Sequence, residues 1–272
     1  MTSPSSSKVI NTARVMDPAS NLLDELYTRA DNPDTPSDVR ATVGKALELV
    51  ETREEYSRKM TYPDTPGARM ICEKTYAMPW KQLYQDSKVG TQYSARWMSG
   101  IGEGQILQFL IRMQKAKRVL EIGMFTGYVA MSMAEALPED GAVVTCEYEP
   151  YLVETARKWF DETPFGKRID IRQGPALDSL DKLATEGQTF DVVYLDADKQ
   201  TYTAYFKKLL DLGLLAEGGT LVVDNSLFHG SPYTQPGSMV DLFNKAVMDD
   251  DRVEQILMPI FDGVSLIRRK GE

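Results

Sequence analysis

From residue 117 onward, short apolar runs alternate with segments of helical periodicity, and this alternation restricts the possible folds more than any other feature of the chain. The apolar runs predict five strands, at 117–123, 142–147, 168–173, 190–198 and 218–225. Each run is followed by a segment with helical spacing of its apolar residues. Strands that alternate with helices form parallel sheets with helices on both faces.

The last two extended runs, 253–260 and 263–269, are joined by the short link Phe261-Asp262. Such a link permits only an antiparallel hairpin, because a parallel crossover needs about a dozen residues or more. The sequence therefore predicts an α/β chain with a Rossmann-like parallel sheet that a C-terminal antiparallel hairpin completes.

The N-terminal third has a different pattern. Residues 1–16 are rich in Ser and Thr without apolar periodicity, and we expect them to be disordered. Apolar residues at helical spacing predict helices over 17–31 and 37–59, so residues 17–100 are interpreted as a helical extension. The catalytic domain is then expected at 101–272.

Composition excludes several classes of function. Lys and Arg total 31 against 40 Asp and Glu, a net charge of −9, which argues against a nucleic-acid partner and against membrane binding through basic residues. With one histidine, His229, and two cysteines, Cys72 and Cys146, a His-rich or all-cysteine zinc site is excluded. Because we find no signal peptide, no apolar run near about 20 residues and no disulfide framework, we expect a cytoplasmic protein.

The first strand ends in Glu121-Ile-Gly123 and continues to Gly127. The two glycines allow a tight turn and close approach of a ligand to the backbone at a helix N-terminus. Their spacing is not the G-x-G-x-x-G of dinucleotide enzymes. Glu147 ends the second strand, where an acidic side chain can accept hydrogen bonds from ribose hydroxyls. An equally simple interpretation is a strand-ending glycine and a solvated glutamate.

Acidic and amide side chains follow two further strands. Asp196 and Asp198 follow the fourth strand together with Lys199, and Asp224-Asn225 follow the fifth. The carboxyl ends of parallel strands meet at one sheet edge, where an all-oxygen set suits Mg²⁺, Mn²⁺ or Ca²⁺. The alternative is that these residues only cap helices or shape turns.

The motifs VLEIGMFTGYVAMSMAEALPEDG, RQGPALDSL, FDVVYLDADK and VVDNSLFHG, in this order, resemble the cation-dependent S-adenosylmethionine O-methyltransferases of the caffeoyl-CoA and catechol type. The resemblance covers roughly Ile101 to Arg269 and implies a class I methyltransferase fold. GMFTGY, MAEALPEDG and DDRVEQILMPIFDGVSLIRR more closely resemble the enzymes of mycosporine pathways, which convert demethyl-4-deoxygadusol to 4-deoxygadusol.

The resemblance also implies roles for individual residues. S-adenosylmethionine would contact Ser99, Glu121, Gly123, Met124, Glu147, Ala176, Asp196 and Asp198. A divalent cation, Mg²⁺ first and Mn²⁺ or Ca²⁺ as alternatives, would be held by Asp196, Asp224 and Asn225, with the acceptor near Asp196. Lys199 would be the general base, and its alternative is a surface charge that opens a helix. His229 stands where plant enzymes carry Asn, so it could contact the acceptor or be an ordinary loop residue.

These roles predict transfer of a methyl group to one oxygen of a small molecule with adjacent oxygens, because a chelating cation fixes the acceptor and lowers its hydroxyl pKa. The expected acceptor is demethyl-4-deoxygadusol, and the alternative is caffeoyl-CoA or a catechol. Two other classes are weighed: an NAD-dependent oxidoreductase, which the missing glycine motif opposes, and a non-catalytic binding protein. A homodimer is expected because it is usual in similar proteins.

Overall fold

The computed structural model describes residues 17–30, 32 and 35–270. The expected disorder of residues 1–16 lies outside these described residues. The chain forms two compact units, with the boundary between Met60 and Thr61. Among the described residues, no helix is long and apolar enough to cross a membrane.

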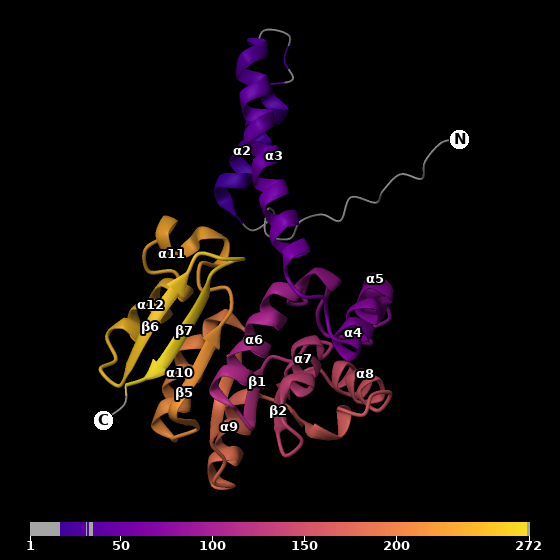
Figure 1. Cartoon of the computed structure of the whole chain (residues 1–272), viewed down its shortest axis with the longest axis vertical. Coiled ribbons are helices and arrows are strands. Elements are labelled where there is room, and N and C mark those ends of the chain that lie inside the picture. Colours follow the sequence, from indigo (N-terminus) through magenta and orange to yellow (C-terminus); the bar gives the residue numbers. More distant parts are fainter. Residues whose placement is uncertain (1–16, 31, 33–34, 271–272) are drawn as a thin grey trace. The chain divides into compact units, whose positions relative to one another are not determined.

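The first unit contains two helices, α2 (Pro18–Arg29) and α3 (Ser37–Met60), which pack side by side (Figure 1). The carboxylate of Asp17 caps α2 and accepts hydrogen bonds from the backbone N–H groups of Ala19 and Ser20, at 3.1 and 3.3 Å. Both helices lie where the apolar spacing predicted them.

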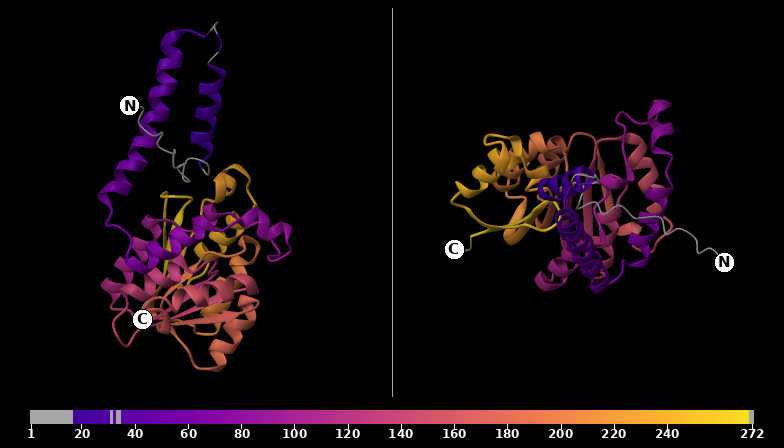
Figure 2. Two further views of the ribbon diagram at one scale, coloured as in Figure 1. Left: turned by 90° about the vertical axis from the view of Figure 1, so that its right-hand side faces the viewer. Right: turned by 90° about the horizontal axis from the view of Figure 1, so that it is seen from above.

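The second unit contains one seven-stranded sheet in the order β3-β2-β1-β4-β5-β7-β6. Figure 1 shows the last two strands of the chain, β6 and β7, in yellow, and Figure 2 shows the structure from two further sides. The strands are β1 (Arg118–Ile122), β2 (Ala142–Glu147), β3 (Ile169–Gln173), β4 (Phe190–Leu195), β5 (Leu215–Val223), β6 (Val253–Met258) and β7 (Val264–Arg269). The first five pair in parallel, and β7 pairs antiparallel with both β5 and β6. The predicted parallel sheet with a closing hairpin is confirmed.

Helices cover both faces of this sheet. The helices of the second unit are α4 (Pro66–Ala77), α5 (Trp80–Gln85), α6 (Ile101–Gln114), α7 (Tyr128–Ala136), α8 (Pro150–Phe160), α9 (Ala176–Thr185), α10 (Tyr202–Asp211), α11 (Ser231–Thr234) and α12 (Met239–Met248). Alternate strand residues point to opposite faces, so Val119 packs in the cluster with α4, α6, α7 and α8. Its neighbour Leu120 packs with α9, α10 and α12.

The sheet-bearing unit begins at Thr61, earlier than the boundary at residue 101 that the sequence pattern indicated. The reason is the packing of α4 on α7, which buries Ala68 and Ile71 in the main core. The carboxylate of Glu135, on α7, accepts hydrogen bonds from the N–H groups of Gly67 and Ala68 at 2.9 and 3.0 Å. The side chain of Thr65, at the N-cap of α4, accepts no hydrogen bond from the backbone of the helix, so Glu135 provides the cap instead.

The hairpin brings a turn to the carboxyl end of β5. The N–H of Leu227 donates to the main-chain oxygen of Asp262, and the N–H of Ser226 donates to that of Gly263, both at 2.8 Å. Because β7 inserts next to β5, its preceding turn lies beside the loop that carries Asp224 and Asn225. The turn between β6 and β7 therefore lies at the same edge of the sheet as the polar residues that follow β4 and β5.

Candidate active site

Gly123, directly after β1, has a left-handed backbone with φ of +98°. A Cβ atom at this position would lie 2.0 Å from the main-chain oxygen of Asp196. Glycine is therefore required by both the backbone angle and the close approach of the two strand ends. The N–H groups of Gly123 and Met124 both donate to the oxygen of Cys146 at 3.1 Å, which fixes the turn against β2.

Two buried glutamates flank this turn. Glu121 is 1% exposed and accepts a hydrogen bond from the Thr145 hydroxyl, and burial raises the pKa of its carboxyl well above the usual range. Glu147 accepts from the N–H groups of Phe125 and Glu149, both at 2.8 Å, while burial raises its pKa. Two carboxylates at a glycine turn suit a ligand that brings hydroxyl donors or positive charge.

Asp196 and Asp224 come from the ends of neighbouring strands, as predicted. Asp224 is 4% exposed, and burial together with the charge of Asp196 raises its pKa to about 7. Asn225 follows with a left-handed backbone of φ +56°, and its N–H donates to the Asp224 carboxylate at 2.7 Å. The charge of Asp196 disfavours the ionised form of the buried Asp224 carboxyl, and two carboxylates with an amide oxygen form a donor set that fits a divalent cation.

Many metal sites in proteins are built from His, Cys, Asp and Glu side chains. In the parts of the chain that the structure describes, no three His, Cys, Asp or Glu side chains are grouped as metal ligands. The predicted set contains two carboxylates and one amide, so that observation does not bear on it. The metal role of Asp196, Asp224 and Asn225 stays a prediction that the charge arrangement favours.

Lys199 lies within the same group. Its amine donates to the Asp196 carboxylate at 2.6 Å and to the Tyr202 hydroxyl at 2.7 Å, and its side chain is 13% exposed. The alternative of a solvated lysine at a helix start does not describe this buried, doubly bonded amine. Its ammonium also lies 6.0 Å from the centre of the Phe228 ring.

Ser99 reaches the site through a buried tyrosine. Its hydroxyl lies 3.1 Å from that of Tyr194, which in turn lies 3.4 Å from the Asp224 carboxylate. Glu103, in the first turn of α6, also belongs to this environment: burial and the charges of Asp224 and Asp196 raise the pKa of its carboxyl. A segment before the first strand thus contributes to the edge of the sheet.

His229 lies on an irregular loop with φ of +53°, and its ring is exposed. The backbone N–H of His229 donates to the Asp262 carboxylate at 2.9 Å. Asp262 is 5% exposed, and burial raises its pKa while the charges of His229 and Lys199 lower it. The backbone of the histidine is therefore held by the turn before β7, and contact of its ring with an acceptor stays a prediction.

Three other predicted residues lie at this edge without direct bonds to the Asp196–Asp224 group. Asp198 is exposed and accepts a hydrogen bond from the Thr201 hydroxyl at 2.7 Å. Ala176 begins α9 beyond the end of β3. Met124 is 3% exposed and packs in the core, and its backbone N–H and C=O bond to Cys146 and Gly127, so its contact with a ligand stays a prediction.

Sequence reasoning missed Tyr194, Tyr202, Glu103 and Asp262. Tyr194 lies in an apolar strand and Tyr202 on an apolar helix face, so both have the pattern of core residues. The only feature of the sequence that could have pointed to Tyr202 is its position three residues after Lys199. Glu103 and Asp262 lie far from Asp196 and Asp224 in the sequence, so no sequence pattern connected them with the site.

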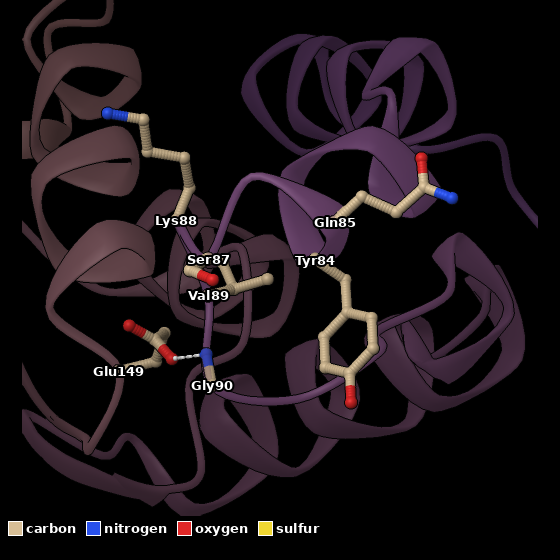
Figure 3. A pocket seen from close by; sticks show the side chains of 7 residues that line it. All are labelled: Tyr84, Gln85, Ser87, Lys88, Val89, Gly90 and Glu149. Carbon is tan, nitrogen blue, oxygen red and sulfur yellow. Dashed lines mark hydrogen bonds between the residues drawn. The ribbon is translucent and has the colours of Figure 1, made fainter.

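A pocket of about 640 Å³ lies beyond the N-terminus of α8 (Figure 3). Glu149 forms one wall and accepts a hydrogen bond from the N–H of Gly90 at 2.8 Å. The other lining residues are Tyr84, Gln85, Ser87, Lys88 and Val89. The pocket adjoins the predicted site because the N–H of Glu149 donates to Glu147, but none of the predicted residues lines it.

Known proteins share the sequence and the fold of this chain. The profile of the O-methyltransferase family matches residues 79–270. The caffeoyl-CoA O-methyltransferase of Petroselinum crispum is 34% identical over 224 residues, which cover 76% of this chain and 86% of that protein. Caffeoyl-CoA O-methyltransferase 1 of Zea mays is 39% identical over 223 residues, 76% of this chain and 80% of the maize protein.

Among solved structures, the SAH-bound methyltransferase PaMTH1 of Podospora anserina superimposes with a TM-score of 0.69. It is 30% identical and covers 82% of this chain and 96% of its own. These similarities favour a methyltransferase over the NAD-dependent oxidoreductase and over the non-catalytic binding protein.

Proposed function

This chain belongs to the O-methyltransferase family, as an S-adenosylmethionine-dependent enzyme of the caffeoyl-CoA type, and from that premise we propose its reaction in detail. The protein moves the methyl group of S-adenosylmethionine to one oxygen of a small acceptor with adjacent oxygens, with the help of a divalent cation. The observation that carries this proposal is the buried group of Asp196, Lys199 and Asp224 at neighbouring strand ends.

Asp196, Asp224 and Asn225 hold the cation in this proposal. A bound Mg²⁺ would neutralise the repulsion between the two carboxylates and lower the pKa of an acceptor hydroxyl. Mn²⁺ and Ca²⁺ suit the same oxygen ligands. Lys199 already pairs with Asp196, and a bound cation would add positive charge beside the buried carboxyl of Asp224, whose pKa the Asp196 charge raises.

Lys199 is the proposed general base. Its neutral amine takes the proton of the acceptor hydroxyl, so the O–H bond breaks and an N–H bond forms. The acceptor oxygen then bonds to the methyl carbon while the carbon–sulfur bond of the sulfonium breaks, leaving the thioether S-adenosylhomocysteine. Alignment of the two reactants contributes roughly 7–11 kcal/mol to such a reaction.

The donor is proposed to lie across the turn after β1. Glu147 accepts hydrogen bonds from its ribose, Ala176 adjoins the adenine, and Asp198 binds its amino group. The methionine end contacts the remaining predicted residues, which are Ser99, Glu121, Gly123, Met124 and Asp196. The glycine at position 123 supports this arrangement, because it lets the loop that carries Asp196 and Asp198 pack directly against the turn after β1.

For the acceptor we propose demethyl-4-deoxygadusol, which would give 4-deoxygadusol in mycosporine biosynthesis. Its support is the sequence resemblance around Gly123 and in the C-terminal hairpin, together with His229, whose backbone Asp262 holds. A caffeoyl-CoA ester or a catechol is the second candidate, and the names of the two plant relatives favour it. The net charge of −9 opposes a substrate with several phosphates.

We also propose that the protein is a homodimer in the cytoplasm. Apolar side chains are exposed on the helix α6 and on the edge strand β6, namely Phe109, Met113 and Ile256, each more than half exposed. Such side chains are typical of a protein interface. Both cysteines are free thiols, which suits a reducing compartment.

The proposal is tested by incubating the protein with S-adenosylmethionine, Mg²⁺ and each candidate acceptor, with products identified by mass. Methylation of demethyl-4-deoxygadusol in preference to caffeoyl-CoA and catechol is the expected result, and its absence would refute the acceptor. Dialysis against a chelator, or Asp196→Ala, should remove turnover. Full activity after either treatment would contradict the role of the cation.

Lys199→Ala should lower kcat by about 10²–10⁴-fold at saturating metal and donor, the range expected for a lost general base. Lys208→Ala, another lysine with a carboxylate partner, is the control. An unchanged kcat for the Lys199 variant would remove the base assignment while leaving the methyltransferase reaction itself in place.

A further inference from the structure

The amine of Lys199 has two fixed hydrogen-bond partners. It donates to the Asp196 carboxylate at 2.6 Å and to the hydroxyl of Tyr202 at 2.7 Å. The ammonium also lies 4.9 Å from the centre of the Tyr202 ring, within the range of a cation–π contact. Asp196 also belongs to the predicted cation site, whereas Tyr202 has no role in the reaction described above.

Tyr202 is held in one position by the core. Its side chain is fully buried at the start of α10, and its ring meets that of Phe243 edge-on, with 5.5 Å between centres. Its hydroxyl donates to the main-chain oxygen of Asp224 at 3.2 Å, which leaves its oxygen free to accept from Lys199. The tyrosine thus joins the ends of β4 and β5.

We propose that Tyr202 is the positioning residue that aims the Lys199 amine at the acceptor. The lysine nitrogen has three tetrahedral directions besides its bond to Cε. Two of them point at Asp196 and Tyr202, so only the third is left to face the acceptor. This inference rests on the proposed role of Lys199 as the general base.

The test is Tyr202→Phe, which removes the hydroxyl and keeps the ring against Phe243. We expect kcat to fall about 10- to 100-fold at saturating Mg²⁺ and donor, because a hydrogen bond to a charged group contributes about 1.5–3 kcal/mol. KM for S-adenosylmethionine and the half-saturating Mg²⁺ concentration should not change. The control is Tyr205→Phe, on the same helix and nearly as buried, which should keep full activity.

A second measurement reports on the lysine itself. The variant and the wild type are treated briefly with acetic anhydride, and acetylation of Lys199 is quantified by peptide mass spectrometry. Lys199 should react faster in Tyr202→Phe, because one of its two anchors is gone. Lys245, whose side chain is 60% exposed, is the internal standard and should react equally in both proteins.

The outcomes separate the two proposals. If Lys199→Ala loses activity but Tyr202→Phe keeps its kcat and its Lys199 labelling rate, the positioning role is wrong and the base assignment stands. If Lys199→Ala keeps its activity, the proposed function fails first. If Tyr202→Phe keeps its kcat at saturating Mg²⁺ but needs a higher Mg²⁺ concentration for half-saturation, the tyrosine acts through Asp224 instead, and the inference is overturned.

Should Tyr202→Phe fail to fold, 3-fluorotyrosine at position 202 keeps the hydroxyl and weakens its oxygen as an acceptor. A smaller decrease in kcat and faster labelling of Lys199 would then be expected. Unchanged values of both would again overturn the proposal.

Discussion

The main-chain oxygen of Asp196 lies 2.0 Å from the position that a Cβ atom would take at Gly123. The two residues follow the adjacent strands β1 and β4, so the turn proposed to hold the methyl donor and the loop proposed to hold the cation are in direct contact. Any side chain at Gly123 must separate them.

Gly123→Ala should therefore abolish binding of S-adenosylhomocysteine, measured by titration calorimetry, and lower the thermal midpoint. Gly187→Ala is the matched control, because Gly187 also has a positive φ but nothing within 4 Å of its Cβ position. That control should lose only the backbone cost of about 1–3 kcal/mol. Equal effects of the two variants would show that the close approach to Asp196 is unimportant.

Asp224 should make the stability of the metal-free protein depend on pH. Its pKa is raised from 3.8 to about 7 in the folded state, so the folded protein binds more protons than the unfolded chain between these values. The free energy of unfolding therefore falls as the pH rises through this window.

Asp224→Asn should accordingly be more stable than the wild type in chelator at pH 8, and this gain should shrink toward pH 4. The expected difference is on the order of 2–4 kcal/mol at most. Urea unfolding at several pH values measures it. A wild type and variant with parallel pH profiles would show that Asp224 titrates normally.

Glu135 should be a main anchor of α4, since its carboxylate accepts from Gly67, Ala68 and the Thr65 hydroxyl. Glu135→Ala leaves these donors without their partner, and we expect a loss of about 1–3 kcal/mol in urea unfolding. Glu139→Ala, at an exposed position after α7, should change little. A Glu135 variant as stable as the Glu139 variant would contradict the capping role.

His229→Asn should change the preference between demethyl-4-deoxygadusol and a catechol, compared as kcat/KM in one competition assay. Asparagine tolerates the left-handed backbone at this position, so the bond from its N–H to Asp262 should persist. An unaltered preference would leave His229 as an ordinary loop residue.

The sequence predicted the strand-end positions well because they depend on local patterns. Asp196, Asp224 and Asn225 each follow a buried apolar run, and parallel strands bring such ends to one edge. The predicted fourth strand, 190–198, was too long: β4 ends at Leu195, where the backbone leaves the ladder and turns toward Lys199. The polar residues after the apolar run belong to the loop.

The sequence by itself determined the alternation of strands and helices, the antiparallel hairpin and the glycine turn, because periodicity, loop length and backbone freedom are local properties. Only the tertiary structure decided that Tyr202 anchors Lys199 and that Asp262 holds His229. It also decided that α4 takes its cap from α7. The apolar pattern of a segment shows which of its faces is buried but not which other segment packs against it. These contacts form because packing brings one hydrogen-bonding group within reach of another.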